Sequence, residues 1–333
     1  MVTWGRRRWM RAVVPALVLV AASPAPALAQ AAPPRVGLLF LVAPEADNSR
    51  RASAFRERMR ELGYEEGRTI AYEYRHAGGK PERLHVLASE LVQSRVEVIV
   101  TVGFQATKAA KGATRTIPVV MAPAGDPVAQ GLVKSLARPE GNVTGVALLS
   151  PEVRSKRLAL LKELVPQLTR VAVLVNPAQR AADGAVATEL ERTAGRLGIR
   201  LDWVELAGAE GLEPLRRRLR AAPVQGLYTV ESPLIDGIAS RIAEIAREHR
   251  LPSAFPFREA VEAGGLMSYA TSFADTQRRA ATYVHRLLGG ARPGDLSIEQ
   301  ADRFELVVSL KTARAIGLTV PRAILAQADQ VIE

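Results

Sequence analysis

The amino-acid sequence predicts an α/β protein in which two doubly wound lobes, each built on a parallel sheet, are joined by hinge crossings. From Pro34 onward, short apolar runs alternate with longer amphipathic stretches, which is typical of β-α-β units around a buried parallel sheet. The same alternation begins afresh near Pro151. The stretch between the two halves, residues 141–149, lacks the composition of a long flexible linker, so we expect ordered segments to connect the lobes.

The first half supplies the strands and helices of one lobe. Its first expected strand is Arg35–Val42, and an amphipathic helix is expected from about residue 50 to 62. Gly63 then provides a good C-terminal stop for that helix. The segments that follow are strands at 69–74, 96–102 and 117–121, with helices near 81–94 and 106–112.

The second half repeats this order of elements. The expected helices lie near 151–164, 182–198, 210–221 and 233–249. They alternate with expected strands at 170–175, 200–206, 225–230, 252–255 and 265–269. This pattern predicts a second doubly wound lobe.

The C-terminal quarter contains too few elements to bury a core of its own. It offers a helix at about 275–288, an apolar run at 304–310 and a helix near 312–316. We therefore assign residues 34–146 with about 273–303 to lobe 1, and residues 147–272 with about 304–333 to lobe 2. Several crossings between two lobes make a hinge, and the cleft between them can open and close around a small molecule.

Residues 1–29 are predicted to be a signal peptide. Four arginines precede an apolar run at residues 12–22, and Ala27-Leu28-Ala29 is a small-x-small cleavage site. A transmembrane anchor is the alternative, but the apolar run is much shorter than the roughly 20 residues that a span needs. We expect export to the periplasm by the general or the twin-arginine route, with cleavage near Ala29. The sequence has no cysteine, so it lacks the acylated residue of a lipoprotein anchor.

The composition excludes several classes of protein. With 48% hydrophobic and 24% charged residues, the 333-residue chain is neither wholly disordered nor a polytopic membrane protein. The lack of cysteine excludes disulfides, thiolate zinc sites, iron–sulfur clusters and cysteine nucleophiles. The net charge of +11 falls to +7 without the four arginines of residues 1–29. The remaining basic residues are spread along helices without an aromatic-rich basic motif, so we expect no nucleic-acid partner.

Candidate ligand-binding residues follow the ends of the predicted strands. In open parallel sheets, ligands bind at the carboxyl ends of the strands, where helix N-termini present unpaired N–H groups. The candidates at these positions are Phe104, Gln105, Ala106, Thr107, Asp126, Asn176, Glu231, Ser232 and Tyr269. They suit a small polar or zwitterionic molecule, with helix-end N–H groups for a carboxylate and Asp126 or Glu231 for an ammonium.

Each candidate also has a purely structural interpretation. Thr107 suits the start of a helix, while Asp126 and Asn176 precede prolines and suit turns. Phe104 and Tyr269 suit a hydrophobic core as well as a pocket wall.

Motifs for catalysis are absent from the sequence. The four histidines do not have metal-ligand spacing, and there is no Gly-x-Ser-x-Gly elbow or phosphate-binding Gly-x-x-x-x-Gly-Lys-Ser/Thr loop. No Gly-x-Gly-x-x-Gly follows the first strand. We therefore predict no catalytic residue, no metal and no cofactor, and we do not expect an enzyme. A hydrolase that uses paired carboxylates stays an alternative.

Seven segments, in this order and spacing, match a known family. They are Phe55–Gly67, Ala124–Val128, Ser135–Gly145, Val175–Pro177, Glu262–Tyr269, Arg279–Tyr283 and Phe304–Ala313. Through them, residues 35–333 resemble ABC-transporter substrate-binding proteins of the group that includes tryptophan- and tyrosine-binding importers, with the type I periplasmic-binding-protein fold. The segments are specific for the family and much less specific for the ligand.

The resemblance implies an extracytoplasmic receptor that closes on its solute and passes it to an ABC permease driven by an ATPase. An aromatic amino acid or a similar solute is what the family leads us to expect, and we expect a monomer. Two departures bear on the pocket: Phe104-Gln105 replaces a small or Pro-containing turn, and Val175 stands where an aromatic residue often precedes the asparagine. Two alternatives are a receptor that feeds a membrane sensor kinase and an extracytoplasmic enzyme that uses the same cleft.

Overall fold

The computed structural model describes residues 1–2, 32–43, 49–148, 151–177, 180 and 184–333. All but the first two residues of the predicted signal peptide lie outside this part of the chain. The chain divides after Ala32, and the fold below is that of residues 33–333. Within the described residues, no helix combines the length and the apolar composition that a membrane span requires.

The first of two sheets has six strands in the order β11-β5-β4-β3-β1-β2. Their bounds are β1 (Arg35–Phe40), β2 (Ala71–His76), β3 (Val98–Thr101), β4 (Val119–Ala124), β5 (Val143–Ala147) and β11 (Glu299–Gln300). All neighbouring strands pair in parallel. Because β2 and β3 flank β1 on opposite sides, the chain winds outward in both directions, which confirms the predicted doubly wound arrangement.

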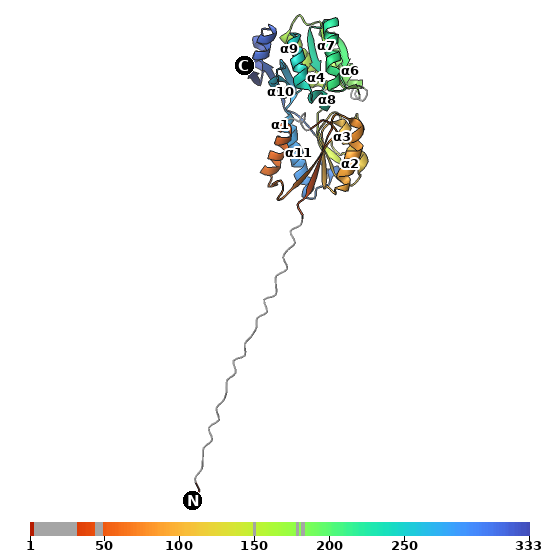
Figure 1. Cartoon of the computed structure of the whole chain (residues 1–333), viewed down its shortest axis with the longest axis vertical. Coiled ribbons are helices and arrows are strands. Elements are labelled where there is room, and N and C mark those ends of the chain that lie inside the picture. Colours follow the sequence, from red (N-terminus) through yellow and green to blue (C-terminus); the bar gives the residue numbers. More distant parts are fainter. Residues whose placement is uncertain (3–31, 44–48, 149–150, 178–179, 181–183) are drawn as a thin grey trace. The chain divides into compact units, whose positions relative to one another are not determined.

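Helices cover both faces of the first sheet. The helices α1 (Ser49–Glu61) and α11 (Phe273–Leu288) lie on one face, and α2 (Leu84–Gln93) and α3 (Phe104–Ala113) lie on the other (Figure 1). Alternate residues of β1 point to opposite faces: Leu38 packs with Met59 of α1, whereas Leu39 packs with Leu91 of α2. The near-continuous apolar run of β1 is therefore explained by burial on both sides.

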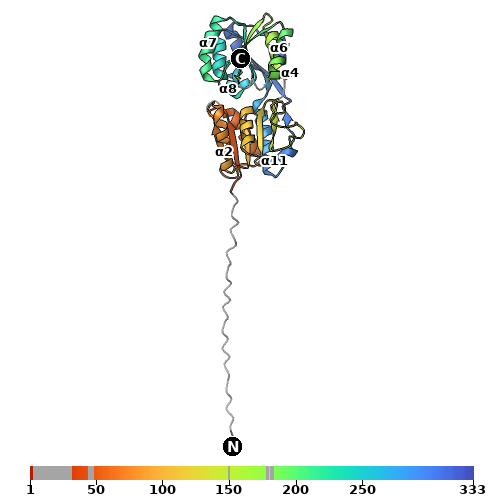
Figure 2. The same ribbon diagram turned by 90° about the vertical axis from the view of Figure 1, so that its right-hand side faces the viewer.

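The second sheet has seven strands in the order β13-β12-β10-β9-β8-β6-β7. Their bounds are β6 (Arg170–Val175), β7 (Arg200–Glu205), β8 (Gly226–Thr229), β9 (Ser253–Phe255), β10 (Met267–Thr271), β12 (Phe304–Ser309) and β13 (Gln330–Ile332). One face packs against α4 (Pro151–Leu164), α6 (Gly184–Arg196), α12 (Leu310–Ile316) and α13 (Arg322–Gln327). The other packs against α7 (Leu212–Ala221), α8 (Pro233–Asp236), α9 (Ala239–Glu248) and α10 (Arg258–Glu262). Figure 2 shows α6 and α7 on opposite sides of this sheet.

The second sheet differs from the prediction in one pair of strands. Strand β12 runs antiparallel to β10, with Thr271 opposite Phe304, whereas the other pairs are parallel. The reason is the path of the chain. β10 leads out of this sheet toward α11 and β11 of the first lobe, and β12 enters on the way back, so it runs in the opposite direction.

Two further expectations need correction. The stretch that we interpreted as a connection, residues 141–149, contains β5, which is buried along its whole length in the first sheet. The helix expected at 233–249 is divided into α8 and α9 around Gly237. Most other elements begin and end within a few residues of their expected positions. Short 3₁₀ turns complete the chain at Pro81–Arg83, Ala209–Gly211 and Pro293–Asp295.

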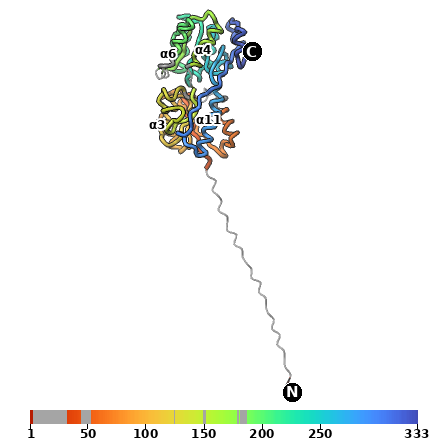
Figure 3. The backbone as a smooth tube through the Cα atoms, turned by 180° about the vertical axis from the view of Figure 1, so that it is seen from behind, coloured from red at the N-terminus to blue at the C-terminus, as the bar shows by residue number. Residues whose placement is uncertain are grey.

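The chain passes between the two sheets after β5, after β10 and after β11. Figure 3 shows that α11 lies with the first lobe, whereas the C-terminal segment lies with the second. The exact residue boundaries of the two lobes stay a prediction.

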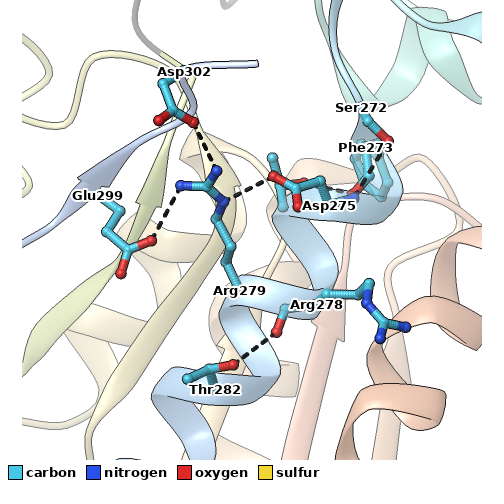
Figure 4. Close-up of polar contacts among 9 residues, drawn as sticks. Ser272, Phe273, Asp275, Arg278, Arg279, Thr282, Glu299 and Asp302 are labelled. Atoms are coloured by element: carbon cyan, nitrogen blue, oxygen red, sulfur yellow. Dashed lines mark hydrogen bonds and ion pairs between the residues drawn. The ribbon is translucent and has the colours of Figure 1, made fainter. Parts of the chain in front are cut away.

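An ion-pair network fixes α11 beside the returning segment. The Arg279 guanidinium contacts Asp275 at 2.8 Å, Glu299 of β11 at 3.3 Å and Asp302 at 2.7 Å (Figure 4). Ser272 caps α11 by accepting a hydrogen bond from the backbone N–H of Asp275. Arg279 therefore joins the segment that leaves the second sheet to the segment that returns to it.

Candidate functional site

A cavity lies where the carboxyl ends of strands from both sheets meet. It encloses about 730 Å³ of space, part of it open to solvent. Its walls are formed by Phe40, Leu41, Val42, Val102, Gly103, Phe104, Pro123, Gly125, Leu148, Arg154, Glu231, Ser232, Pro233, Asp236, Phe257 and Phe273. This is the position at which open α/β sheets bind ligands.

Gly103 permits a close approach between the two sides of this cavity. It follows β3 and precedes α3, with a backbone φ of 83° that favours glycine. A Cβ atom at this position would lie 2.7 Å from Cγ of Pro233, which belongs to α8 of the other lobe. The absence of a side chain at Gly103 therefore lets α8 reach the first lobe.

The one-turn helix α8 connects the two hydrophobic cores. Leu234 is buried in the core of the first lobe, among residues of α2 and α3, whereas its neighbour Ile235 is buried in the core of the second lobe. Consecutive residues of a helix point in different directions, so a single turn can serve both cores. α8 ends at Asp236, and α9 begins at Ala239.

Four phenylalanines give the cavity an aromatic wall. Phe40 stacks on His76 with a centroid distance of 4.9 Å, and Phe104 lies 5.7 Å from the Lys108 ammonium. Phe257 and Phe273 meet edge to face, with ring centroids 5.4 Å apart. Because they come from both lobes and from the start of α11, the rings provide an apolar surface on more than one side of a guest.

A buried ionic cluster forms the polar part of the wall. Glu231 follows β8, and its carboxylate accepts hydrogen bonds from Arg154 Nε at 2.6 Å and Arg157 Nη1 at 2.9 Å. The Arg157 side chain is 0% exposed and also donates to the carbonyl oxygens of Tyr269 and Thr229. Its guanidinium lies 4.7 Å from the centre of the Tyr228 ring. Such a buried charge is tolerated only when it is paired and hydrogen-bonded.

The cluster holds Glu231 in its ionised form. Burial alone would raise the pKa of the carboxyl, but the nearby Arg154 and Arg157 guanidiniums outweigh it and lower the pKa of Glu231 to about 2. Burial raises the pKa of the Tyr228 hydroxyl to about 12, and this hydroxyl donates a hydrogen bond to the carbonyl oxygen of Arg154. At neutral pH the cluster of Arg154, Arg157 and Glu231 therefore carries one net positive charge.

The structure brings three of the nine predicted ligand-binding residues to the cavity: Phe104, Glu231 and Ser232. Gln105 lines a separate groove between α2 and α3. Tyr269 is partly buried and its ring lies 6.1 Å from that of Phe304.

The remaining predicted residues have partners inside the protein. Ala106 and Asn176 are buried, and the Thr107 hydroxyl lies 2.8 Å from that of Thr101. Asp126 accepts hydrogen bonds from the backbone N–H groups of Val128 and Ala129, each at 3.0 Å, which is a turn-capping role. Their part in ligand binding stays a prediction.

Several cavity residues were not predicted from the sequence. Phe257, two residues beyond β9, and Phe40, at the end of β1, occupy strand-end positions that the same rule covers. Asp236 lies in the short helix α8 and Phe273 begins α11, and neither segment was assigned a part in ligand binding. The sequence could not predict Arg154 as a cavity residue, because its position beside Glu231 depends on the packing of α4 against the sheet.

Comparison with known proteins identifies the family. Residues 36–332 match the model of the family described as ABC transporter substrate binding protein. The chain belongs to this family. An ABC transporter substrate-binding protein binds the solute of the transporter, and such proteins typically have no enzymatic activity. Among the described residues, no group of three or more histidine, aspartate or glutamate side chains is placed to hold a metal ion.

The individual relatives have low sequence identity to this chain, but the similarity extends over most of its length. This substrate-binding protein is 24% identical to a tyrosine-binding protein of Clostridioides difficile over 85% of this chain and 81% of the relative. A Streptococcus pneumoniae ABC domain crystallised in complex with L-Trp is 22% identical, with a TM-score of 0.81 over 90% of this chain and 100% of that one. A conserved domain protein of Vibrio cholerae is 26% identical, with a TM-score of 0.82 over 90% and 99% of the two chains. These structures confirm the two-lobed α/β fold.

Proposed function

We propose that this protein is the exported receptor of an ABC importer and that it captures an aromatic amino acid, or a molecule of similar shape, between its lobes. The observation that carries the proposal is the cavity of about 730 Å³ with phenylalanines on several sides and an ionic cluster on one. An amino acid with an aromatic side chain matches such a surface, because its ring can pack on aromatic rings and its charged end can meet the cluster.

The relatives support this choice of solute. One of them is named as a tyrosine-binding protein and another was crystallised with L-Trp. Their distance from this chain leaves the solute itself to be determined. A permease and its ATPase are the partners that the proposal requires, and the predicted export places the receptor outside the cytoplasm.

The test is a thermal-shift screen of the exported protein with the amino acids, purines and short carboxylic acids. We expect tyrosine, tryptophan or phenylalanine to raise the melting temperature, because a ligand at 100 times its Kd stabilises the folded state by about 2.7 kcal/mol. Calorimetry should then give the Kd. Trp203 lies in β7, and its ring N–H donates to Glu191, so its fluorescence is a poor reporter of binding at the cavity.

Two results would contradict the proposal. A shift with sugars or purines but with no aromatic amino acid would show that the solute class is wrong. Formation of a product from the bound molecule, measured by chromatography after incubation, would show that the protein is an enzyme.

A further inference from the structure

The N-terminus of the ten-residue helix α3 lies in the wall of the main cavity and has no capping side chain. Gly103, which lines the cavity, occupies the N-cap position and offers no side-chain acceptor to the helix. The Thr107 N–H donates to the carbonyl oxygen of Gly103 at 3.2 Å. The three backbone N–H groups before it, at residues 104–106, have no acceptor within the helix, and the helix dipole favours an anion at this end.

Ser232, on the opposite lobe, supplies an independent polar group to the same cavity. It occupies the N-cap position of α8, but its side chain makes no capping hydrogen bond. The part of the chain that the structure describes contains no other partner for this hydroxyl. A serine at an N-cap normally accepts a hydrogen bond from its helix, so the Ser232 hydroxyl is available to a guest.

The Ser232 hydroxyl is also accessible from the cavity. The residue is only 3% exposed, and it lines the cavity. Unpartnered hydroxyl oxygens with less than 1 Å² of exposed surface occur at Thr229, Ser268 and Thr271, and the oxygen of Ser232 is not among them. The small surface that Ser232 retains therefore includes its hydroxyl.

The start of α3 and Ser232 lie close to each other. Pro233 follows Ser232, and its Cγ would lie 2.7 Å from a Cβ atom placed on Gly103. The first lobe and the second lobe thus contribute these two groups to the same part of the cavity. Ser232 also directly follows Glu231, so this part adjoins the ionic cluster.

We propose that the carboxylate of the solute binds between the N-terminus of α3 and Ser232, where the first backbone N–H groups of the helix and the Ser232 hydroxyl donate hydrogen bonds to it. This inference rests on the proposed function and adds the orientation of the guest. Because the donors come from both lobes, the subsite is complete only when the lobes are together. The ring of the solute lies among the phenylalanines of the cavity wall, of which Phe104 is the first residue of α3.

The variant Ser232→Ala tests the subsite, because it removes only the hydroxyl. Its matched control is Ser268→Ala, the same substitution at a buried, unpartnered serine that lines neither the main cavity nor the smaller pocket beside it. Calorimetry compares three probes. L-Tryptophan carries both charges, indole-3-propionate keeps the carboxylate without the ammonium, and tryptamine keeps the ammonium without the carboxylate. If L-tyrosine binds the wild-type protein more tightly, 3-(4-hydroxyphenyl)propionate and tyramine take the same places.

Ser232→Ala should weaken binding of the amino acid and of the propionate about tenfold, which is the loss of one hydrogen bond to a charged group. The amine should bind the wild type and the variant equally, and more weakly than the amino acid does. Ser268→Ala should leave all three affinities unchanged.

The stability of the unliganded variants supplies a second readout. The melting temperature of Ser232→Ala should equal that of the wild type, because the hydroxyl does not cap α8. A clear fall that Ser268→Ala does not share would show that the Ser232 hydroxyl has a structural role and would overturn the proposal.

The binding results separate this inference from the proposed function. If the wild-type protein binds an aromatic amino acid and Ser232→Ala binds it equally well, the subsite is wrong and the proposed function stands. The same conclusion follows if Ser232→Ala loses affinity for the amine by the same factor as for the amino acid. If the wild-type protein binds none of tryptophan, tyrosine and phenylalanine, the proposed function and the subsite both fall.

Discussion

Replacement of Glu231 by glutamine should destabilise the protein by about 3 kcal/mol at pH 7, although the two side chains have nearly the same shape. The Glu231 side chain is 14% exposed and its carboxylate faces the fully buried Arg157. Removing one partner of a buried ion pair typically costs about 3–5 kcal/mol, because the other charge stays buried without compensation. The lower end applies here, since Arg157 keeps its hydrogen bonds to the carbonyl oxygens of Thr229 and Tyr269.

The pH dependence of stability gives a similar magnitude by another route. The pKa of Glu231 is lowered from 4.5 to about 2 in the folded protein, and each pH unit corresponds to about 1.4 kcal/mol. A carboxyl with a lowered pKa stabilises the folded state above its unfolded pKa, and this contribution is lost as the pH falls through the folded pKa. Glu231 should therefore contribute about 3 kcal/mol above pH 4.5, and this contribution should disappear toward pH 2.

Urea unfolding of the wild type and Glu231→Gln, followed by circular dichroism between pH 7 and pH 2.5, measures both effects. The difference between the two proteins should be largest at pH 7 and should shrink below pH 4.5, because protonation makes the wild-type side chain neutral as well. The control is Glu248→Gln, whose side chain is exposed and pairs with Arg216, and which should leave the stability nearly unchanged because solvent screens an exposed ion pair. If the difference in unfolding free energy between Glu231→Gln and the wild type were the same at all pH values, the reasoning would be refuted.

Two further predictions concern the approach of the lobes and the crossing segments. Gly103→Ala should weaken binding of the solute severalfold in calorimetry, because the new Cβ would meet Pro233. The control is Gly63→Ala, at a glycine with a similar φ of 92° but with no atom within 4 Å of the added Cβ. It should lower only the stability, by about 1–2 kcal/mol, and leave the affinity unchanged. Equal affinities in the two variants would contradict a role in closure. Arg279→Met should lower stability by about 1 kcal/mol, measured as the melting temperature, and most of the difference should vanish in 1 M NaCl, which screens partly exposed ion pairs. A difference that salt does not change would contradict an electrostatic role.

The sequence was sufficient to predict the two lobes, because buried parallel strands have apolar sequences that alternate with amphipathic helices. It was insufficient for β5, whose segment contains Gly145 and was interpreted as part of the connection between the lobes. In the structure, Gly145 has a φ of 124°, and a Cβ atom there would lie 2.4 Å from the carbonyl oxygen of Met121 in β4. The glycine is required for close strand pairing at an irregular point of the sheet, and no local pattern distinguishes this need from that of a turn.

For the candidate site, too, the sequence predicted only some of the side chains and their charges. The strand-end rule selected Phe104, Glu231 and Ser232, and these three residues line the cavity. It interpreted Glu231 as a partner for an ammonium, whereas the structure places two guanidiniums on its carboxylate. Arg154 and Arg157 are more than 70 positions away in the sequence, on a helix whose packing brings them to β8. The electrostatic sign of a buried site depends on such tertiary contacts, so it could not be predicted from the strand end alone.

The position of Phe273 connects the cavity to the crossing segments. Its ring forms part of the aromatic wall and packs with Phe257, while its backbone begins α11 directly after β10. Six residues further along the same helix, Arg279 binds Glu299 and Asp302 beside the segment that returns to β12. A guest that packs on Phe273 therefore acts on a helix that is already tied to the returning segment. One helix, α11, therefore carries both a wall of the cavity and the contacts to the returning segment, which agrees with the proposed capture of a solute between the lobes.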